Sequence, residues 1–123
     1  MMYEHYLKEL FMNPPDRIYL VYRDEAVGLL SYDGEFYTFE YLPEYAAKGL
    51  PALPGIEESK AVSRFLWSYF LTRIPSHKSP LFQRLVDEYD LSEPEQHNWM
   101  ALLATLGSKV ATDPFLMKVS LED

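Results

Sequence analysis

The chain has 123 residues, 48% of them hydrophobic and 15% aromatic, which is enough apolar material for one hydrophobic core. Its formal net charge of -8 argues against direct binding to DNA or RNA, because nucleic-acid phosphates are usually bound by a basic face. The chain has no cysteine, which excludes disulfides, thiolate metal sites and cysteine nucleophiles.

Neither a membrane span nor a targeting segment is expected. No stretch approaches the roughly 18 uninterrupted apolar residues that a transmembrane helix needs. The first residues, Met1 to His5, lack the basic start and apolar run of a signal peptide. The sequence therefore predicts a cytoplasmic protein whose residues 1–123 form a single domain.

The beginning of the chain combines one helix with two strands. Residues 3–12 carry apolar side chains at helical spacing, and Asn13-Pro14-Pro15-Asp16 ends this helix because proline cannot continue it. The segments 17–23 and 26–32 are rich in β-branched and aromatic residues, which predicts two strands joined by a short turn.

A hairpin and a long loop follow. Asp33-Gly34 is a strong hairpin signal, because a type I′ turn needs positive φ at both central positions. The next strand spans 35–41, and we expect its three alternating aromatics to face the core. Residues 42–55 are rich in proline and glycine and are expected to wrap over the sheet as an ordered loop with a short turn near 44–47. The three aromatics are Tyr37, Phe39 and Tyr41.

Two helices are predicted next. The first spans 57–73 and ends before Pro75, because Val62, Phe65, Leu66, Tyr69 and Phe70 recur on one helical stripe. The second spans 80–89, with Ser79 as its N-cap and Pro80 in its first turn. Its expected apolar face consists of Leu81, Phe82, Leu85, Val86 and Tyr89.

The third helix begins with the capping-box pattern Ser92-Glu93-Pro94-Glu95 and ends at Gly107. Its expected inward face is Trp99, Leu102, Leu103 and Leu106, so Trp99 is interpreted as a core residue. A last strand over 115–119 returns to the sheet. Strands followed by helices predict an α+β fold, with an antiparallel sheet of four or five strands and three to four helices.

The motifs of common enzyme and cofactor sites are absent from the sequence. The five glycines are too scattered to make a phosphate-binding loop, and the three histidines form no metal-binding pair on one helix. No catalytic residue, metal ligand or cofactor is therefore predicted. A basic cluster of Arg73, His77, Lys78 and Arg84 is interpreted as a solvated helix end and loop.

The predicted helix 57–73 has a second apolar face, formed by Trp67, Leu71 and Ile74. These side chains either pack under the loop 42–55 or against the N-terminal helix, or they stay exposed for a partner. Tryptophan is enriched at binding hot spots, so we take Trp67 as the candidate anchor. The loop that follows, with Ser76, His77 and Lys78, would add polar contacts at the rim.

Several short motifs follow one another along the chain. The first is Val27-Gly28-Leu29-Leu30, which matches a V-G-x-L strand. Residues 36–45 and Leu53-Pro54 are similar to the motifs F-x-Y-x-x-E-(Y/W) and L-P, and Tyr69 to Pro75 is similar to F-F-x-N-L-L-P. Arg84-Leu85 and Leu102 to Gly107 are two further motifs before the final strand. This ordered set resembles the N-terminal domain of HipA-type toxin kinases. The resemblance covers about residues 17–119 and leaves the helix over 1–12 outside it.

The chain departs from the family pattern at several positions. Thr72 and Ser76 replace the asparagine and the acidic residue around L-L-P, and residues 107–113 do not match G-x-D-x-x-G-A. The ATP-binding and catalytic motifs of the kinase body are not present, so we expect a free-standing version of the N-terminal domain.

In three-gene relatives of this toxin–antitoxin family, a small protein called HipS binds and inhibits a separate kinase, HipT. A DNA-binding HipB-like protein completes such systems. The resemblance thus implies a HipS-like antitoxin, not an enzyme, that binds a HipA/HipT-type kinase without contacting nucleic acid or membrane itself. Two alternatives stay open: a small enzyme or ligand-binding domain, and a remnant N-terminal domain of a HipA kinase.

Overall fold

The computed structural model describes residues 14–49, 51–106, 115–119 and 121. Five strands form one antiparallel sheet in the order β4-β3-β2-β1-β5. The strands are β1 (Arg17–Tyr22), β2 (Glu25–Tyr32), β3 (Tyr37–Tyr41), β4 (Lys60–Ser63) and β5 (Phe115–Lys118). The described α-helices are α2 (Pro43–Ala47), α3 (Ser68–Leu71), α4 (Pro80–Tyr89) and α5 (Trp99–Leu106). The predicted α+β class is confirmed, whereas the helix predicted over 3–12 and its end at Asn13 lie outside the described residues.

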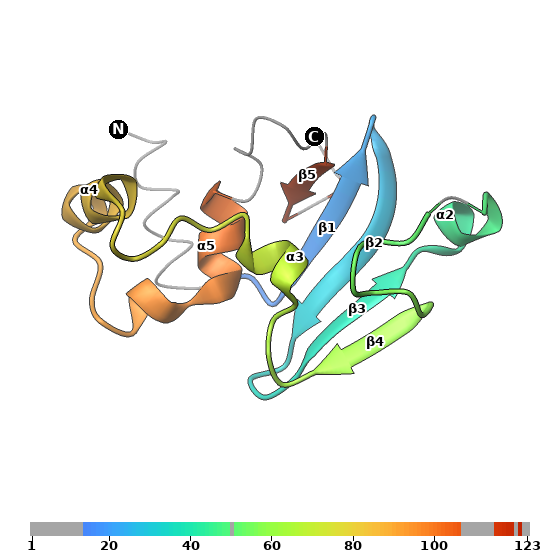
Figure 1. Ribbon diagram of the computed structural model, residues 1–123, viewed down its shortest axis with the longest axis horizontal. Helices are drawn as coiled ribbons and strands as arrows, with labels where there is room; N and C mark the ends of the chain where they lie inside the picture. Colours follow the sequence, from blue (N-terminus) through green and yellow to red (C-terminus); the bar gives the residue numbers. More distant parts are fainter. Residues whose placement is uncertain (1–13, 50, 107–114, 120, 122–123) are drawn as a thin grey trace.

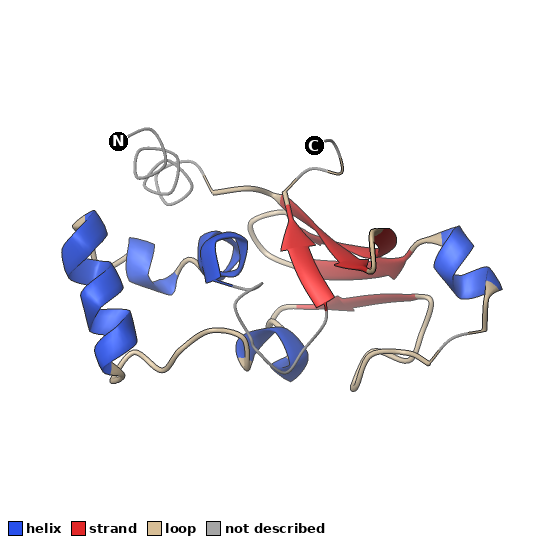
Figure 2. Cartoon of the chain, turned by 90° about the horizontal axis from the view of Figure 1, so that it is seen from above, coloured by secondary structure: helices blue, strands red, loops and turns tan. Residues whose placement is uncertain are grey.

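The helices are distributed around the sheet. The short helix α2 lies beyond one end of the sheet, and α4 lies beyond the other end, on the far side of α5 (Figures 1 and 2). None of the helices in the described ranges is long and apolar enough to cross a membrane. The strands predicted over 17–23, 26–32, 35–41 and 115–119 correspond to β1, β2, β3 and β5.

The two hairpin turns differ from the prediction in their geometry. The two-residue turn with positive φ at both central positions joins β1 to β2, at Arg23 (φ 50°) and Asp24 (φ 63°). The hairpin at Asp33-Gly34 is confirmed, but only Gly34 of this pair has a positive φ, so the predicted type I′ turn is wrong. There the Asp33 carboxylate accepts hydrogen bonds from the backbone N–H groups of Phe36 (2.7 Å) and Glu35 (2.8 Å), which lower the pKa of Asp33.

The aromatic face of β3 is buried, as predicted for Tyr37, Phe39 and Tyr41. The Tyr41 hydroxyl donates to the Ile56 carbonyl (2.5 Å) and accepts from the Leu53 N–H (2.7 Å). These bonds hold the segment around 51–56 against the core, and Leu53 and Ile56 are themselves buried. The long loop is therefore ordered where it is described, with α2 in place of the expected short turn.

The predicted helix over 57–73 is wrong. Residues 60–63 form the edge strand β4, which pairs with β3, and a loop leads from it to Trp67, the N-cap of the one-turn helix α3. The backbone of Trp67 is extended (φ -64°, ψ 149°). Leu66 and Phe70 are buried, but Val62 and Phe65 are 58% and 80% exposed.

Tertiary pairing explains this difference. Lys60 lies directly opposite Glu40 and Val62 lies opposite Thr38, so an opposite-charge pair and a β-branched pair stabilise the strand. The Ser63 Oγ accepts a hydrogen bond from the Phe65 N–H (3.1 Å), which offers the backbone a turn in place of a helix. Of the predicted helical stripe, only Tyr69 and Phe70 lie in a helix, α3. Val62 lies in β4, and Phe65 and Leu66 lie in the loop between the two elements.

The later helices follow the sequence signals more closely. Helix α4 has the predicted bounds, and the Ser79 Oγ accepts from the Phe82 N–H (3.1 Å). Phe82 is buried as predicted. Leu81 was predicted to lie on the same packed face, but it is exposed. The capping box is present as well, because Ser92 N–H donates to Glu95 Oε1 (2.8 Å).

The capping box does not start one long helix. It begins a single 3-10 turn, Glu95–His97, after which Asn98 is extended (ψ 94°). Asn98 then caps α5, since its Oδ1 accepts from the Ala101 N–H (3.1 Å). Leu102 and Leu103 are fully buried as predicted, and Trp99 is partly buried. Gly107, the predicted end of this helix, lies outside the described residues.

Gly28 allows the close approach of β2 and β3, which predicts a large effect of substitution. A Cβ at this position would overlap the Phe39 ring and lie 2.9 Å from the Glu40 carbonyl oxygen. We expect Gly28→Ala to lower the free energy of unfolding by about 1–3 kcal/mol, because a packed core does not yield to an added methyl group. Ser31→Ala on the same strand is the control, with an expected change within about 0.5 kcal/mol in urea denaturation. Equal stability of the two variants would contradict this packing.

Candidate functional site

Four of the residues predicted to bind a partner lie together around a pocket of about 340 Å³. Leu71, Ile74, Ser76 and His77 line it, and the pocket is completed by residues from α5 and the turn before it. Leu71 is 39% exposed, and Ile74 packs against the buried cores on both sides. The completing residues are His97 and Trp99, with Pro75 beside Ile74.

Trp67 and Lys78, the other two predicted residues, do not line this pocket. Trp67 is partly buried against the main core, and its ring meets Phe70 edge to face with centroids 6.5 Å apart. Lys78 is exposed, and its backbone N–H donates to Ser76 Oγ (3.2 Å). Trp67 is thus neither sealed in the core nor fully open to solvent.

His77 belongs to an aromatic cluster between α4 and α5. Its ring stacks on Phe82 at a centroid distance of 4.2 Å and lies 4.9 Å from the ring of His97 and 5.7 Å from Trp99. Its Nε2 is buried without a hydrogen-bond partner among the described residues. His77 is therefore a partly buried wall of the pocket, not a flexible residue at its rim.

The basic cluster was interpreted as solvated, which is wrong for Arg73, because this side chain is only 4% exposed, whereas Lys78 and Arg84 are exposed. The Arg73 Nη2 donates to the Tyr69 hydroxyl (3.0 Å) and its Nη1 to the Phe115 carbonyl (3.4 Å), while the guanidinium lies 5.2 Å from the centre of the Tyr69 ring. Arg73 thus joins α3 to β5, a role that charge spacing in the sequence does not reveal.

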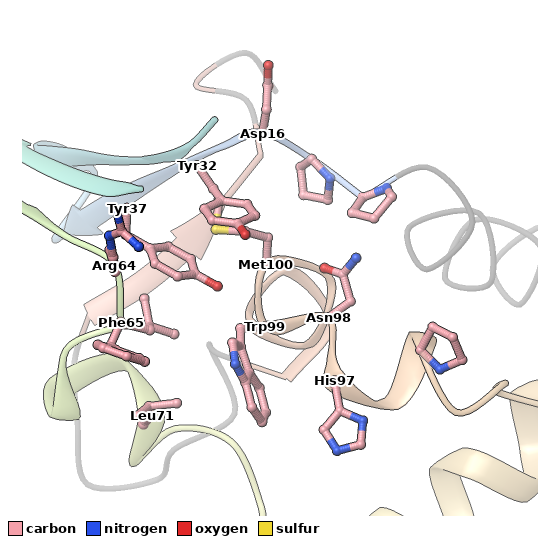
Figure 3. A pocket seen from close by; sticks show the side chains of 14 residues that line it. Asp16, Tyr32, Tyr37, Arg64, Phe65, Leu71, His97, Asn98, Trp99 and Met100 are labelled. Atoms are coloured by element: carbon pink, nitrogen blue, oxygen red, sulfur yellow. The ribbon is translucent and has the colours of Figure 1, made fainter. Parts of the chain in front are cut away.

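A larger pocket of about 750 Å³ adjoins the first, and the two share Leu71, His97 and Trp99 (Figure 3). One wall carries Tyr32 and Tyr37, whose rings stack at 4.3 Å, and another carries Phe65. The other lining residues are Pro14, Pro15, Asp16, Arg64, Leu66, Pro94, Asn98 and Met100. We call the two pockets together the groove.

The sequence did not identify the most exposed aromatic side chain of the groove. Phe65 was assigned to the core by helical spacing, yet it is 80% exposed. Tyr37 and Trp99 were interpreted as core residues, and both border the groove. Ser63 is the signal that could have indicated the exposure of Phe65, because its side chain favours a turn at the point where the helix was expected.

The titratable side chains that line the groove include a buried tyrosine. Burial raises the pKa of Tyr37 to about 12, so its hydroxyl keeps its proton at neutral pH. Within the described ranges, no group of three or more histidine, aspartate or glutamate side chains is placed to hold a metal ion. Arg64 and His97 each lie beside a carboxylate, Glu35 (3.5 Å) and Glu93 (3.8 Å) respectively.

No protein-family model matches the chain, and no curated protein matches it in sequence. The resemblance to HipA proteins therefore depends on the ordered motifs alone. Of these motifs, Val27 to Leu30 lies in β2, residues 36–45 contain β3 and most of α2, and Tyr69 to Pro75 begins in α3.

Proposed function

We propose that this chain is a HipS-like antitoxin, a protein-binding domain that binds and inhibits a separate HipA/HipT-type serine/threonine kinase. The observation that carries this proposal is the exposed Phe65 beside the groove, next to Leu71. A large aromatic side chain that is 80% exposed at the edge of a concave surface is typical of a protein-binding site.

In this proposal the domain docks where the fused N-terminal domain sits in HipA-type kinases. Trp67 supplies the apolar anchor and blocks the kinase active site, with Leu71 and Ile74 beside it. Partial burial of Trp67 against the main core supports this role, because a side chain held by its own domain loses less entropy on binding. Ser76, His77 and Lys78 provide contacts next to it. A HipB-like DNA-binding protein is a further member of the proposed complex.

The test is co-expression with a HipA-like kinase that lacks its own N-terminal domain and is encoded beside this chain. The kinase alone is expected to arrest growth, and the wild-type chain is expected to restore growth and to co-purify with the kinase. A kinase that arrests growth equally well with and without this chain, and that does not co-purify with it, would contradict the proposal.

An enzyme or ligand-binding domain is the second candidate, because about 750 Å³ lies within the range of small-molecule pockets. The protonated Tyr37 and the ion pair of Arg64 with Glu35 give this candidate less support than the exposed Phe65 gives protein binding. A small molecule that raises the melting temperature of the wild-type chain, but not that of Phe65→Ala, would favour the ligand-binding candidate.

A further inference from the structure

The larger pocket contains polar groups that an apolar anchor does not use. The Tyr37 side chain is only 6% exposed, and its hydroxyl points into the pocket (Figure 3). No other residue in the described ranges forms a hydrogen bond with this hydroxyl. Its neighbour Tyr32 differs, because the Tyr32 hydroxyl already donates to the Gly34 carbonyl (3.0 Å). Tyr37 is therefore a protonated donor that faces the pocket and has no acceptor among the described residues.

Two more donors face the same pocket from the side of α5. Asn98 uses its Oδ1 to cap the helix, which leaves its amide NH₂ as a donor. The indole N–H of Trp99 likewise has no hydrogen-bond acceptor among the described residues. Backbone carbonyl groups of an extended peptide are acceptors spaced along its length, so they match donors on opposite walls of one groove.

The charges around the pocket indicate which side chains of a bound peptide would be favoured. Asp16 lines the pocket, and Arg64, the one lysine or arginine among the described lining residues, lies 3.5 Å from the Glu35 carboxylate. The whole chain carries a net charge of -8. Phe65 and Leu71 offer apolar contact in the same space. The matching partner is both basic and apolar.

We propose that the larger pocket binds an extended segment of the partner kinase, with backbone carbonyl groups accepting hydrogen bonds from Tyr37 and Asn98. An apolar side chain of this segment packs against Phe65 and Leu71, and a lysine or arginine lies near Asp16. The inference rests on the proposed function for the identity of the partner, but it concerns a contact separate from the Trp67 anchor.

The test compares a tyrosine of the pocket with a tyrosine outside the groove. Tyr37→Phe removes only the hydroxyl and keeps the ring, so we expect its dissociation constant for the kinase to rise about 3- to 10-fold by calorimetry. Tyr19→Phe, the matched control, removes a hydroxyl from β1 at a position that lines neither pocket, and is expected to bind the kinase like the wild type. Affinity of the wild type is also expected to fall as salt is raised, as for an acidic protein that binds a basic segment.

The outcomes separate this inference from the proposed function. Wild-type binding together with an unchanged affinity of Tyr37→Phe would overturn the peptide contact and leave the antitoxin function standing. Affinity that is insensitive to salt would overturn the basic character of the segment. A kinase that does not bind the wild-type chain at all would overturn both proposals.

Discussion

Phe70→Ala is expected to lower the free energy of unfolding by about 3–5 kcal/mol. The Phe70 side chain is 1% exposed, and its ring contacts Phe39, with centroids 5.7 Å apart, and Tyr69, at 5.2 Å. It therefore fixes the one-turn helix α3 to the face of the sheet, and truncation leaves a cavity between them. Chemical denaturation followed by circular dichroism measures the loss.

Phe65→Ala is the matched control for this prediction. Both phenylalanines belong to the stripe that helical spacing assigned to the core, but Phe65 is 80% exposed, so its truncation should change stability by no more than about 0.5 kcal/mol. If Phe70→Ala does not fold, the pair Phe70→Leu and Phe65→Leu gives the same comparison with a smaller effect. Equal losses at the two positions would contradict the strand and loop that replace the predicted helix.

Trp67→Ala is expected to weaken binding to the kinase by about 2 kcal/mol or more, roughly a 30-fold rise in the dissociation constant. The indole is the largest side chain proposed to enter the kinase, and hot-spot tryptophans contribute disproportionately to affinity. Calorimetry with the purified kinase measures the change, and growth rescue should fail in parallel.

Partial packing of Trp67 against the core requires a stability control, because a loss of folding would also reduce binding. The free energy of unfolding of Trp67→Ala is therefore measured as well, and binding is measured at a temperature where this variant is fully folded. Leu116→Ala, at a β5 position that is 40% exposed and lines neither pocket of the groove, should bind like the wild type. Wild-type affinity of folded Trp67→Ala would mean that this residue is not the anchor.

Local signals in the sequence were sufficient wherever a short segment determines its own structure. Ser79 before Pro80 predicted the start of α4, and alternation in β3 predicted that Tyr37, Phe39 and Tyr41 share a buried face. In both cases the decisive contacts lie within the element or its nearest neighbour. The Asp33 turn was found for the same reason, although its side chain stabilises a longer loop than expected.

Sequence patterns failed where residues far away in the chain determine the local structure. Residues 60–63 become a strand because Lys60 and Val62 meet Glu40 and Thr38, which lie about 20 residues earlier. Arg73 is buried because Tyr69 and the Phe115 carbonyl accept its hydrogen bonds, and Phe115 is 42 residues away. Helical spacing and charge spacing describe a segment alone, so neither pattern contains these partners.

The candidate site could be predicted only in part, because some of its residues are neighbours in the sequence and others come from distant elements. Leu71, Ile74, Ser76 and His77 are close in sequence and do line one pocket. Its opposite wall consists of His97 and Trp99, and the adjoining pocket brings in Tyr37 and Asp16. These residues come from separate elements, so only the folded chain shows that they border one groove.

Protection of Leu71→Cys by the kinase tests most directly whether this surface binds the partner. The chain has no cysteine, so Leu71→Cys and Leu116→Cys each introduce one thiol, at positions that are 39% and 40% exposed. A saturating amount of the kinase, itself blocked beforehand at its own thiols, should slow alkylation at position 71 at least 10-fold and leave position 116 unchanged. Equal alkylation rates at position 71 with and without bound kinase would contradict the proposed surface.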